Sequence, residues 1–132
     1  MSRTCSGAGS RPGTSARCSR GHGVTQERIV LDPGIGFGKT LDHDLEILAN
    51  LHAFASLGFP VLVGPSRKGF IGQLTQQSVD ARGWGTATIV ALAVEQGANI
   101  LRVHEVKPMQ DVVSVATAIA RRKSAGVREQ HA

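Results

Sequence analysis

Polar side chains follow three apolar runs of this sequence directly, at the points where strands of a parallel sheet would end. Asp32 follows the run Ile29–Leu31, the segment Ser66–Lys68 follows a second run, and Arg102 and His104 lie at a two-residue spacing in a third. Ligands of α/β proteins bind at the carboxyl ends of such strands. A carboxylate accepts paired N–H groups, and a planar guanidinium beside an imidazole can clamp an anion. The three groups together indicate a flat, nitrogen-rich, phosphorylated ligand.

Each of these groups also has a plainer interpretation. Asp32 could cap the loop that follows it, and the cations of Ser66–Lys68 could serve only to keep the surface soluble. Arg102 and His104 would both be solvated if their strand lay at the edge of the sheet. The remaining histidines, of which His43 and His52 are examples, have no comparable neighbours in the sequence and are interpreted as surface residues.

A loop with glycines at alternate positions follows the first strand. The segment Gly34–Thr40 ends in Gly-Lys-Thr, as a phosphate-binding loop does, but Pro33 stands where that pattern requires its first glycine. Two other interpretations stay open. The glycines could form a turn that needs positive φ angles, or Gly36 could let the backbone approach a flat ligand, with Phe37 nearby.

The alternation of short apolar runs with helix-like segments predicts the order βαβαβα and therefore an α/β fold with a parallel sheet. Such a unit fits either part of a (β/α)8 barrel or part of a doubly wound sheet. Three strands alone leave both edges of the sheet unpaired. The strands are expected at Arg28–Asp32, Pro60–Gly64 and Asn99–Val106, and the helices from Leu41 toward Gly58 and at Phe70–Thr75, Thr86–Gln96 and Pro108–Arg122.

The apolar pattern also predicts which faces are covered. The run Ile29–Leu31 has no polar alternation, which is typical of a strand covered on both faces. The helix Thr86–Gln96 is apolar nearly all round, so we expect it to be well buried. Thr40 or Asp42 can cap the first helix, and Asp44 suits the positive end of its dipole. The inner stripe of the last helix is expected to consist of Val112, Val115, Ala116 and Ile119.

The first 22 residues differ in composition from the rest of the 132-residue chain. They hold four of its 15 Lys and Arg and none of its 10 Asp and Glu, so most of the net charge of +5 lies in this segment. The rest of the chain is close to neutral, which argues against a nucleic-acid-binding domain. Without Leu, Ile, Val or Phe, this segment is expected to be disordered and to represent a wrongly started or out-of-frame translation. It also holds Cys5 and Cys18, so no disulfide or zinc site is expected. The chain shows no signal peptide and no run long enough for a membrane helix.

Three segments of the chain together resemble the dihydropteroate synthase family, in that family's order and spacing. These segments are Leu31–Lys39, Val63–Lys68 and Arg102–Val106. The resemblance extends from Gly23 to Arg122 and implies the last three β–α units of a pterin-binding (β/α)8 TIM barrel. It divides the chain into a non-homologous tail at 1–22, a partial barrel at 23–126 and a second tail at 127–132. The family's earlier strands have no counterpart in this sequence.

The resemblance also implies roles for residues at the strand ends. Pterin would be bound by Asp32, Gly36, Phe37, Lys68 and Arg102, 4-aminobenzoate by Ser66 and Arg67, and diphosphate by Arg102 and His104. The implied enzyme is a transferase of folate biosynthesis, which joins 6-hydroxymethyl-7,8-dihydropterin diphosphate to 4-aminobenzoate and releases diphosphate. It would be cytoplasmic, would use Mg²⁺ through a ligand that this chain lacks, and would be a homodimer at full length. We do not expect it to bind nucleic acid or a membrane.

Two alternatives to this interpretation stay open. The chain could be an inactive truncated fragment of such a barrel, or a pterin-binding domain like that of a methyltetrahydrofolate methyltransferase. The combination of Ser66–Lys68 with Arg102 and His104 favours the synthase over the methyltransferase. Because part of a barrel leaves sheet edges open, we expect the isolated chain to have little synthase activity and to aggregate.

Overall fold

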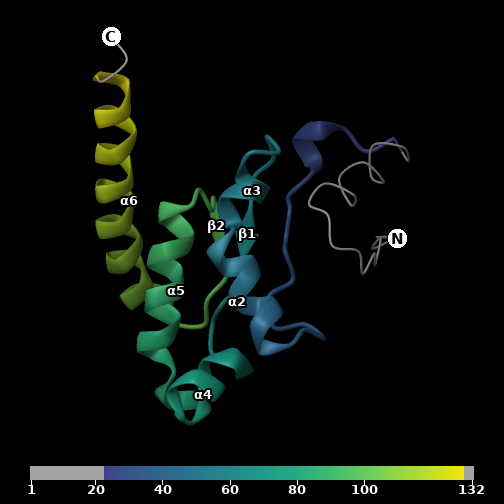
Figure 1. Ribbon diagram of the computed structural model, residues 1–132, viewed down its shortest axis with the longest axis vertical. Helices are drawn as coiled ribbons and strands as arrows, with labels where there is room; N and C mark the ends of the chain where they lie inside the picture. Colours follow the sequence, from purple (N-terminus) through teal and green to yellow (C-terminus); the bar gives the residue numbers. More distant parts are fainter. Residues whose placement is uncertain (1–22, 130–132) are drawn as a thin grey trace.

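A computed structural model describes residues 23–129 of the chain and shows helices gathered on one side of a small parallel sheet (Figure 1). The predicted disorder of Met1–His22 and the end of the predicted tail, residues 130–132, lie outside the described part. The elements in chain order are η1 (Gln26–Arg28), α2 (Leu41–Ala49), α3 (Leu51–Ala55), β1 (Leu62–Val63), α4 (Gly69–Thr75), η2 (Val79–Ala81), α5 (Gly83–Glu95), β2 (Ile100–Leu101) and α6 (Val106–Glu129).

The sheet is parallel, as the sequence predicts, but its strands are shorter than expected. β1 pairs with β2 in the register Leu62 to Ile100. On the other side of β1, Leu31 forms a single parallel bridge with Val61, so the predicted strand Arg28–Asp32 is reduced to one bridge. The predicted strand Asn99–Val106 is also wrong beyond its first residues. Each outer segment has a neighbour on one side only, which limits how far the ladder of hydrogen bonds extends.

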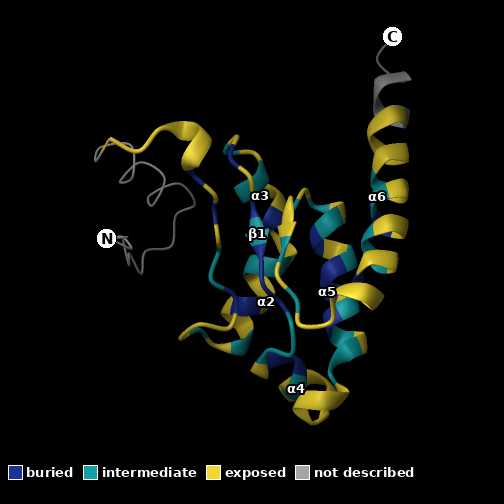
Figure 2. Cartoon of the chain, turned by 180° about the vertical axis from the view of Figure 1, so that it is seen from behind, coloured by how far each residue is buried: buried dark blue, intermediate teal, exposed yellow. Residues whose placement is uncertain are grey.

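The hydrophobic core lies between the sheet and helices α2, α3, α4 and α5. Val63 is completely buried at its centre, and Leu51, Phe70, Ile71 and Ile89 pack around it. A smaller cluster of Ile29, Leu31 and Phe59 covers the first strand segment. Buried residues are concentrated along β1 and the helix faces turned toward it (Figure 2). The core therefore holds the strand ends in place from the side of the helices.

One predicted face is wrong and another is right only in part. Val30 is 46% exposed, so the first strand segment is covered on one face rather than on both. In α6, Ala116 is buried and Val112 half-buried, as predicted, but Val115 and Ile119 are exposed and Met109 is buried in their place. Helix α6 carries apolar residues on two adjacent faces. Its packing against α5 buries the face that carries Met109.

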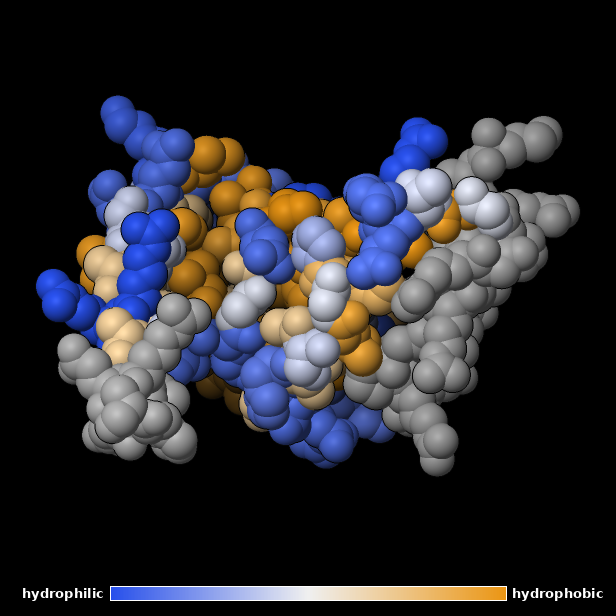
Figure 3. Space-filling model, turned by 90° about the horizontal axis from the view of Figure 1, so that it is seen from above, coloured by the Kyte–Doolittle hydropathy of each residue, from blue (hydrophilic) through white to orange (hydrophobic). Residues whose placement is uncertain are grey.

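Helix α5 is also less covered than its composition predicts. Leu92 is 55% exposed, although Val90 and Ala93 on the same helix are buried. In the view from above, apolar side chains are exposed among polar ones (Figure 3). Among residues 23–129, no helix has both the length and the apolar character that crossing a membrane requires.

Helix boundaries differ from the predictions where the sequence signal is weak. The predicted helix after Leu41 is broken at Asn50, whose φ and ψ of −121° and 27° separate α2 from α3. Helix α6 continues to Glu129 instead of ending at Arg122. The segment after Arg122 contains no proline, and Lys and Ala favour the helix. Gly58 and Gly97 lie just past helices at positive φ, as predicted for residues that follow a helix.

Candidate active site at the strand ends

The polar segments after the strands gather at one end of the sheet. The amide of Arg102 donates to the carbonyl of Val63 over 3.0 Å, which brings the end of β2 beside the residues that follow β1. The guanidinium of Arg102 lies over Gly64, where a Cβ would be 2.9 Å from Nη2. Gly64 therefore leaves the space that this side chain occupies, and an exposed cation is held against the end of the sheet.

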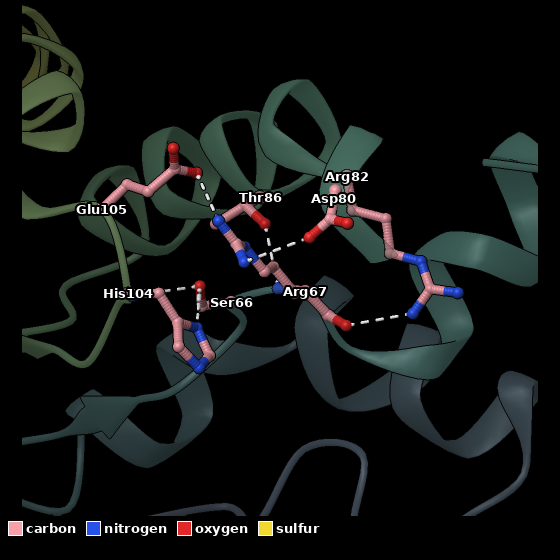
Figure 4. A network of polar contacts seen from close by, with 7 residues as sticks. All are labelled: Ser66, Arg67, Asp80, Arg82, Thr86, His104 and Glu105. Carbon is pink, nitrogen blue, oxygen red and sulfur yellow. Dashed lines mark hydrogen bonds and ion pairs between the residues drawn. The ribbon is translucent and has the colours of Figure 1, made fainter. Parts of the chain in front are cut away.

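Ser66 and His104 form a direct contact between the turns that follow β1 and β2. Ser66 Oγ lies 2.7 Å from His104 Nδ1 and also accepts a hydrogen bond of 3.2 Å from the His104 amide (Figure 4). The hydroxyl thereby fixes both the backbone and the ring of His104. The structure brings together the first residue of one predicted group and the last residue of another.

The turn that carries these residues contains a non-glycine residue in the left-handed region. The Lys68 amide approaches the carbonyl of Pro65 at 3.4 Å, which closes a β-turn, and Arg67 at its third position has a φ of 56°. Such turns favour Gly or Asn at this position. A left-handed non-glycine residue costs about 1–3 kcal/mol and persists only where its surroundings hold it. Here the Arg67 amide donates to the buried hydroxyl of Thr86, over 3.1 Å.

The side chain of Arg67 is shared between two carboxylates from other loops. Its Nη1 lies 3.6 Å from Asp80 Oδ1 and its Nη2 lies 3.3 Å from Glu105 Oε2 (Figure 4). Because both acids are exposed, each pair contributes only about 0.2–1 kcal/mol to stability. The pairs orient the guanidinium more than they stabilise the fold.

A cation lies over an aromatic ring on the opposite side of the turn. Lys68 Nζ is 3.8 Å from the centre of the Phe37 ring, which belongs to the glycine loop. The aliphatic part of Lys68 passes over Gly36, where a Cβ would be 2.8 Å from Lys68 Cδ. Three of the predicted pterin-binding residues therefore contact one another, and Gly36 is needed because its neighbour occupies the space of a side chain.

The glycine loop adopts positive φ at Gly34, Gly36 and Gly38 and is held by side chains on both sides. Asp32 Oδ1 accepts from the Gly34 amide over 2.8 Å, and Lys39 Nζ donates to the Gly34 carbonyl over 2.7 Å. Asp32 thus caps the loop, as its plainer interpretation predicts, while its side chain stays exposed at the strand end. Lys39 is turned into its own loop, unlike the lysine of a phosphate cradle.

Asp44 lies in the first turn of α2, as predicted, but it also has a role that sequence reasoning did not find. It is only 2% exposed, and its Oδ1 accepts a hydrogen bond of 2.8 Å from the Gly36 amide. The Thr40 hydroxyl, which accepts from the His43 amide, provides the cap of α2. Asp44 therefore supports the loop that carries Phe37. The sequence signal was its position on the same face as the apolar Leu41 and Leu48.

Four further residues of the site were missed: Asp80, Arg82, Thr86 and Glu105. Arg82 Nη1 donates to the carbonyl of Arg67 over 3.1 Å, so it acts on the same turn as Thr86 (Figure 4). These residues contact the turn from loops and helix ends well separated from it in sequence, where no spacing rule connects them. Among the side chains that the structure describes, residues 23–125, no three His, Cys, Asp or Glu residues lie close enough together to hold a metal ion.

Comparison with known proteins gives a consistent result. Residues 14–104 match the family model described as pterin binding enzyme. The chain is 47% identical over 104 residues to the dihydropteroate synthase of Synechocystis sp. and 43% identical over 103 residues to that of Escherichia coli. Each alignment covers 78% of this chain, which spans only 36% of the length of either relative.

The solved structures that are similar to this chain include further dihydropteroate synthases. A dihydropteroate synthase from Coxiella burnetii in complex with pteroic acid matches with a TM-score of 0.79 and 34% identity, over 81% of this chain and 40% of that one. The Yersinia pestis enzyme with a sulfonamide drug complex matches with a TM-score of 0.76 and 36% identity, over 81% and 39%.

Proposed function

The chain belongs to the pterin binding enzyme family, and we propose on this premise that it is the C-terminal part of a dihydropteroate synthase. It would contribute the last three β–α units of a (β/α)8 barrel, residues 23–126, with segments 1–22 and 127–132 outside that domain. The observation that carries the proposal is the gathering of Lys68, Arg102 and the Ser66–His104 pair at one end of the sheet.

The pterin ring would lie between the glycine loop and the turn after β1. Asp32 would accept from ring N–H groups, because an ionised carboxylate accepts two such bonds side by side. Lys68, held over the ring of Phe37, would donate to a ring oxygen or nitrogen. Gly36 would keep this side of the ring free of side chains. Arg102 would stack on the other face of the pterin from its place over Gly64.

The diphosphate and the second substrate would lie at the turns after β1 and β2. Arg102 and His104 would bind the diphosphate, with Ser66 Oγ fixing the imidazole. The 4-aminobenzoate would lie beside Ser66 and Arg67, and a similar dihydropteroate synthase that was solved with 4-aminobenzoic acid supports this molecule as a ligand.

The reaction would be a substitution at the pterin methylene. Its C–O bond to diphosphate breaks, and the amine nitrogen of 4-aminobenzoate forms a new C–N bond and loses a proton. Fixed cations stabilise the negative charge that develops on the leaving group. In this chain Arg102, with His104 as a hydrogen-bond donor, would supply that stabilisation. No side chain needs to form a covalent bond to the substrate.

Three properties extend the proposal to the whole enzyme. It would be a cytoplasmic enzyme of folate biosynthesis and would form a homodimer at full length. It would also use Mg²⁺, with protein ligands outside the described residues, where the ion would add positive charge at the diphosphate. No step of the reaction is assigned to the ion here.

A chimeric enzyme tests the function. Residues 23–126 would replace the matching last third of the Escherichia coli relative, and dihydropteroate formation would be measured. We expect synthase activity, because the strand ends of this chain carry the cations and the carboxylate that the reaction needs. Lys68→Ala in the chimera should lower kcat/KM by about 100-fold, the effect of losing a positioned substrate contact.

The control is Lys107→Ala, which removes an exposed lysine of α6 and should leave activity unchanged. A folded chimera without activity would contradict the proposal and would favour an inactive fragment. The 132-residue chain by itself should show little activity and should self-associate; vigorous turnover by this chain alone would contradict that expectation.

A further inference from the structure

Arg82 is a half-buried cation whose side chain serves a turn other than its own. It lies at the start of α5, and its guanidinium reaches back to the segment after β1 (Figure 4). Nη1 donates to the carbonyl of Arg67 over 3.1 Å and approaches that of Lys68 at 3.5 Å, while Nε donates to the carbonyl of Gln77 over 3.2 Å. Among the side chains that the structure describes, residues 23–125, no carboxylate forms an ion pair with Arg82, so its charge is directed at backbone oxygens.

Helix α4 leaves the space in which this guanidinium lies. A Cβ on Gly72 would be 2.3 Å from Arg82 Nη2 and 2.6 Å from its Cζ. Gly69 in the same helix would meet nothing within 4 Å. A side chain at position 72 is therefore incompatible with the present place of Arg82, whereas one at position 69 is not.

The two carbonyls that Arg82 contacts belong to Arg67 and Lys68, in the turn whose side chains point to two different parts of the site. Ser66, before them, faces His104, and Lys68 faces Phe37 in the glycine loop. The left-handed backbone of Arg67 makes this divergence possible, because it reverses the direction of the chain between the two side chains. Thr86 holds the amide of Arg67 and Arg82 holds its carbonyl, so both polar groups of that residue's backbone are engaged.

We propose that Arg82 is a positioning residue of this site. By binding the carbonyls of Arg67 and Lys68, it keeps the turn in the conformation that presents Ser66 and Lys68 to their separate ligand parts. Arg82 itself contacts no ligand. A planar guanidinium is required, because its forked donors reach carbonyls on two separate segments, which a single ammonium cannot reproduce. The effect on ligands rests on the proposed function, whereas the effect on the turn does not.

The effect on the turn is tested by NMR spectroscopy of the full, ligand-free chain. The readouts are the Arg82 Nε–H signal, which a hydrogen bond to a carbonyl should protect from exchange with water, and the amide coupling constant of Arg67, which reports its φ. Gly72→Ala should abolish the protected signal and move the coupling constant toward that of an average chain. Gly69→Ala, the matched control, should leave both unchanged.

Arg82→Lys provides a second variant that keeps the positive charge. It should also release the coupling constant of Arg67, although circular dichroism should show an unchanged helix content. If Gly72→Ala or Arg82→Lys leaves the left-handed signature of Arg67 in place in a folded chain, the proposal is wrong.

The effect on ligands is tested by titrating the chimera that carries residues 23–126, with and without each substitution, with 4-aminobenzoate, 6-hydroxymethylpterin and inorganic diphosphate. For Arg82→Lys we expect dissociation constants for the first two probes about tenfold higher, a change of about 1.4 kcal/mol. Inorganic diphosphate should lose less affinity, about twofold, because Arg102 is held over Gly64 outside this turn and only His104 depends on Ser66.

The pattern across probes separates positioning from a general loss of structure. Equal weakening for all three probes would overturn the positioning role and assign Arg82 to the fold alone. A folded chimera with the wild-type sequence of residues 23–126 that binds none of the probes would contradict the proposed function, while the NMR result would still decide whether Arg82 holds the turn.

Discussion

Two segments at the ligand end of this sheet need left-handed backbone, and they obtain it in different ways. The loop Gly34–Gly38 uses glycine at each such position, while the turn Ser66–Lys68 uses Arg67. Glycine adopts positive φ without steric strain, but it loses more entropy on folding than any other residue. Arginine at positive φ is strained in the folded state, and its neighbours must hold it there.

The difference follows from what each segment contacts. Gly36 must lack a side chain because Lys68 passes over it, and a flat ligand would need the same free space. Arg67 has a side chain with partners, since its guanidinium lies between Asp80 and Glu105. The loop is thus a surface with few side chains, and the buried carboxylate of Asp44 in α2 holds it through the Gly36 amide. The turn is a fixed support for Ser66 and Lys68. The predictions below test each half of this contrast.

Replacing Asp44 with alanine should have the largest effect on stability. Its buried carboxylate accepts from the Gly36 amide, and a hydrogen bond to a charged group contributes about 1.5–3 kcal/mol. We therefore expect Asp44→Ala to lower the free energy of unfolding by about 2 kcal/mol, measured by urea denaturation.

Asp42→Ala is the matched control for this variant. Asp42 is an exposed acid in the same first turn of α2, so the two variants share any effect of the helix dipole. Equal losses for both variants would show that Asp44 does not support the glycine loop.

Sequence reasoning identified the strand ends but not the groups that hold them. Asp32 and Arg102 could be found because each follows a short apolar run, and parallel strands end on one side of a sheet. Asp44 and Arg82 could not be assigned roles in this way. Their partners are backbone atoms of other segments, and no residue type or spacing at those positions signals the contact.

The errors in the predicted elements have related physical causes. The apolar run around Val30 indicates a covered strand, but coverage depends on which neighbours are present on each face. The predicted stripe of α6 is right at Ala116 and wrong at Val115 and Ile119, because apolar residues occur on more than one face of this helix. Local pattern therefore predicts the type of element, and packing selects its exposed face and its length.

Alanine substitutions in the glycine loop should have a smaller effect. Gly36 and Gly38 have φ angles of 75° and 62°, so an alanine at either position is strained by about 1–2 kcal/mol. The lost flexibility of the unfolded chain offsets about 0.5–1 kcal/mol, so Gly36→Ala and Gly38→Ala should each lower the free energy of unfolding by about 1 kcal/mol. Only Gly36→Ala meets a neighbour, because Lys68 passes over Gly36 and nothing lies near the Cβ position of Gly38.

The two glycine variants therefore separate strain from contact. Gly36→Ala should displace Lys68 and remove its interaction with Phe37, which contributes about 0.5–1 kcal/mol at an exposed site. NMR shifts of the Phe37 ring protons would report this loss. If Gly38→Ala moves the same signals as strongly, the loop responds to backbone strain as a whole and Gly36 has no special contact.

The smallest effect is expected at Arg67, where the order of two substitutions is the test. Arg67→Gly and Arg67→Ala both remove the two exposed ion pairs, but only glycine relieves the left-handed strain, which is about 1–2 kcal/mol for a residue with a Cβ. The flexibility of unfolded glycine offsets about 0.5–1 kcal/mol of this gain. Arg67→Gly should therefore be more stable than Arg67→Ala by up to about 1 kcal/mol, measured by thermal unfolding. The opposite order would mean that Arg67 leaves the left-handed region in solution, and the contrast between loop and turn would then fail. Retention of this order in the Arg82→Lys background would show that Thr86 alone can hold the turn.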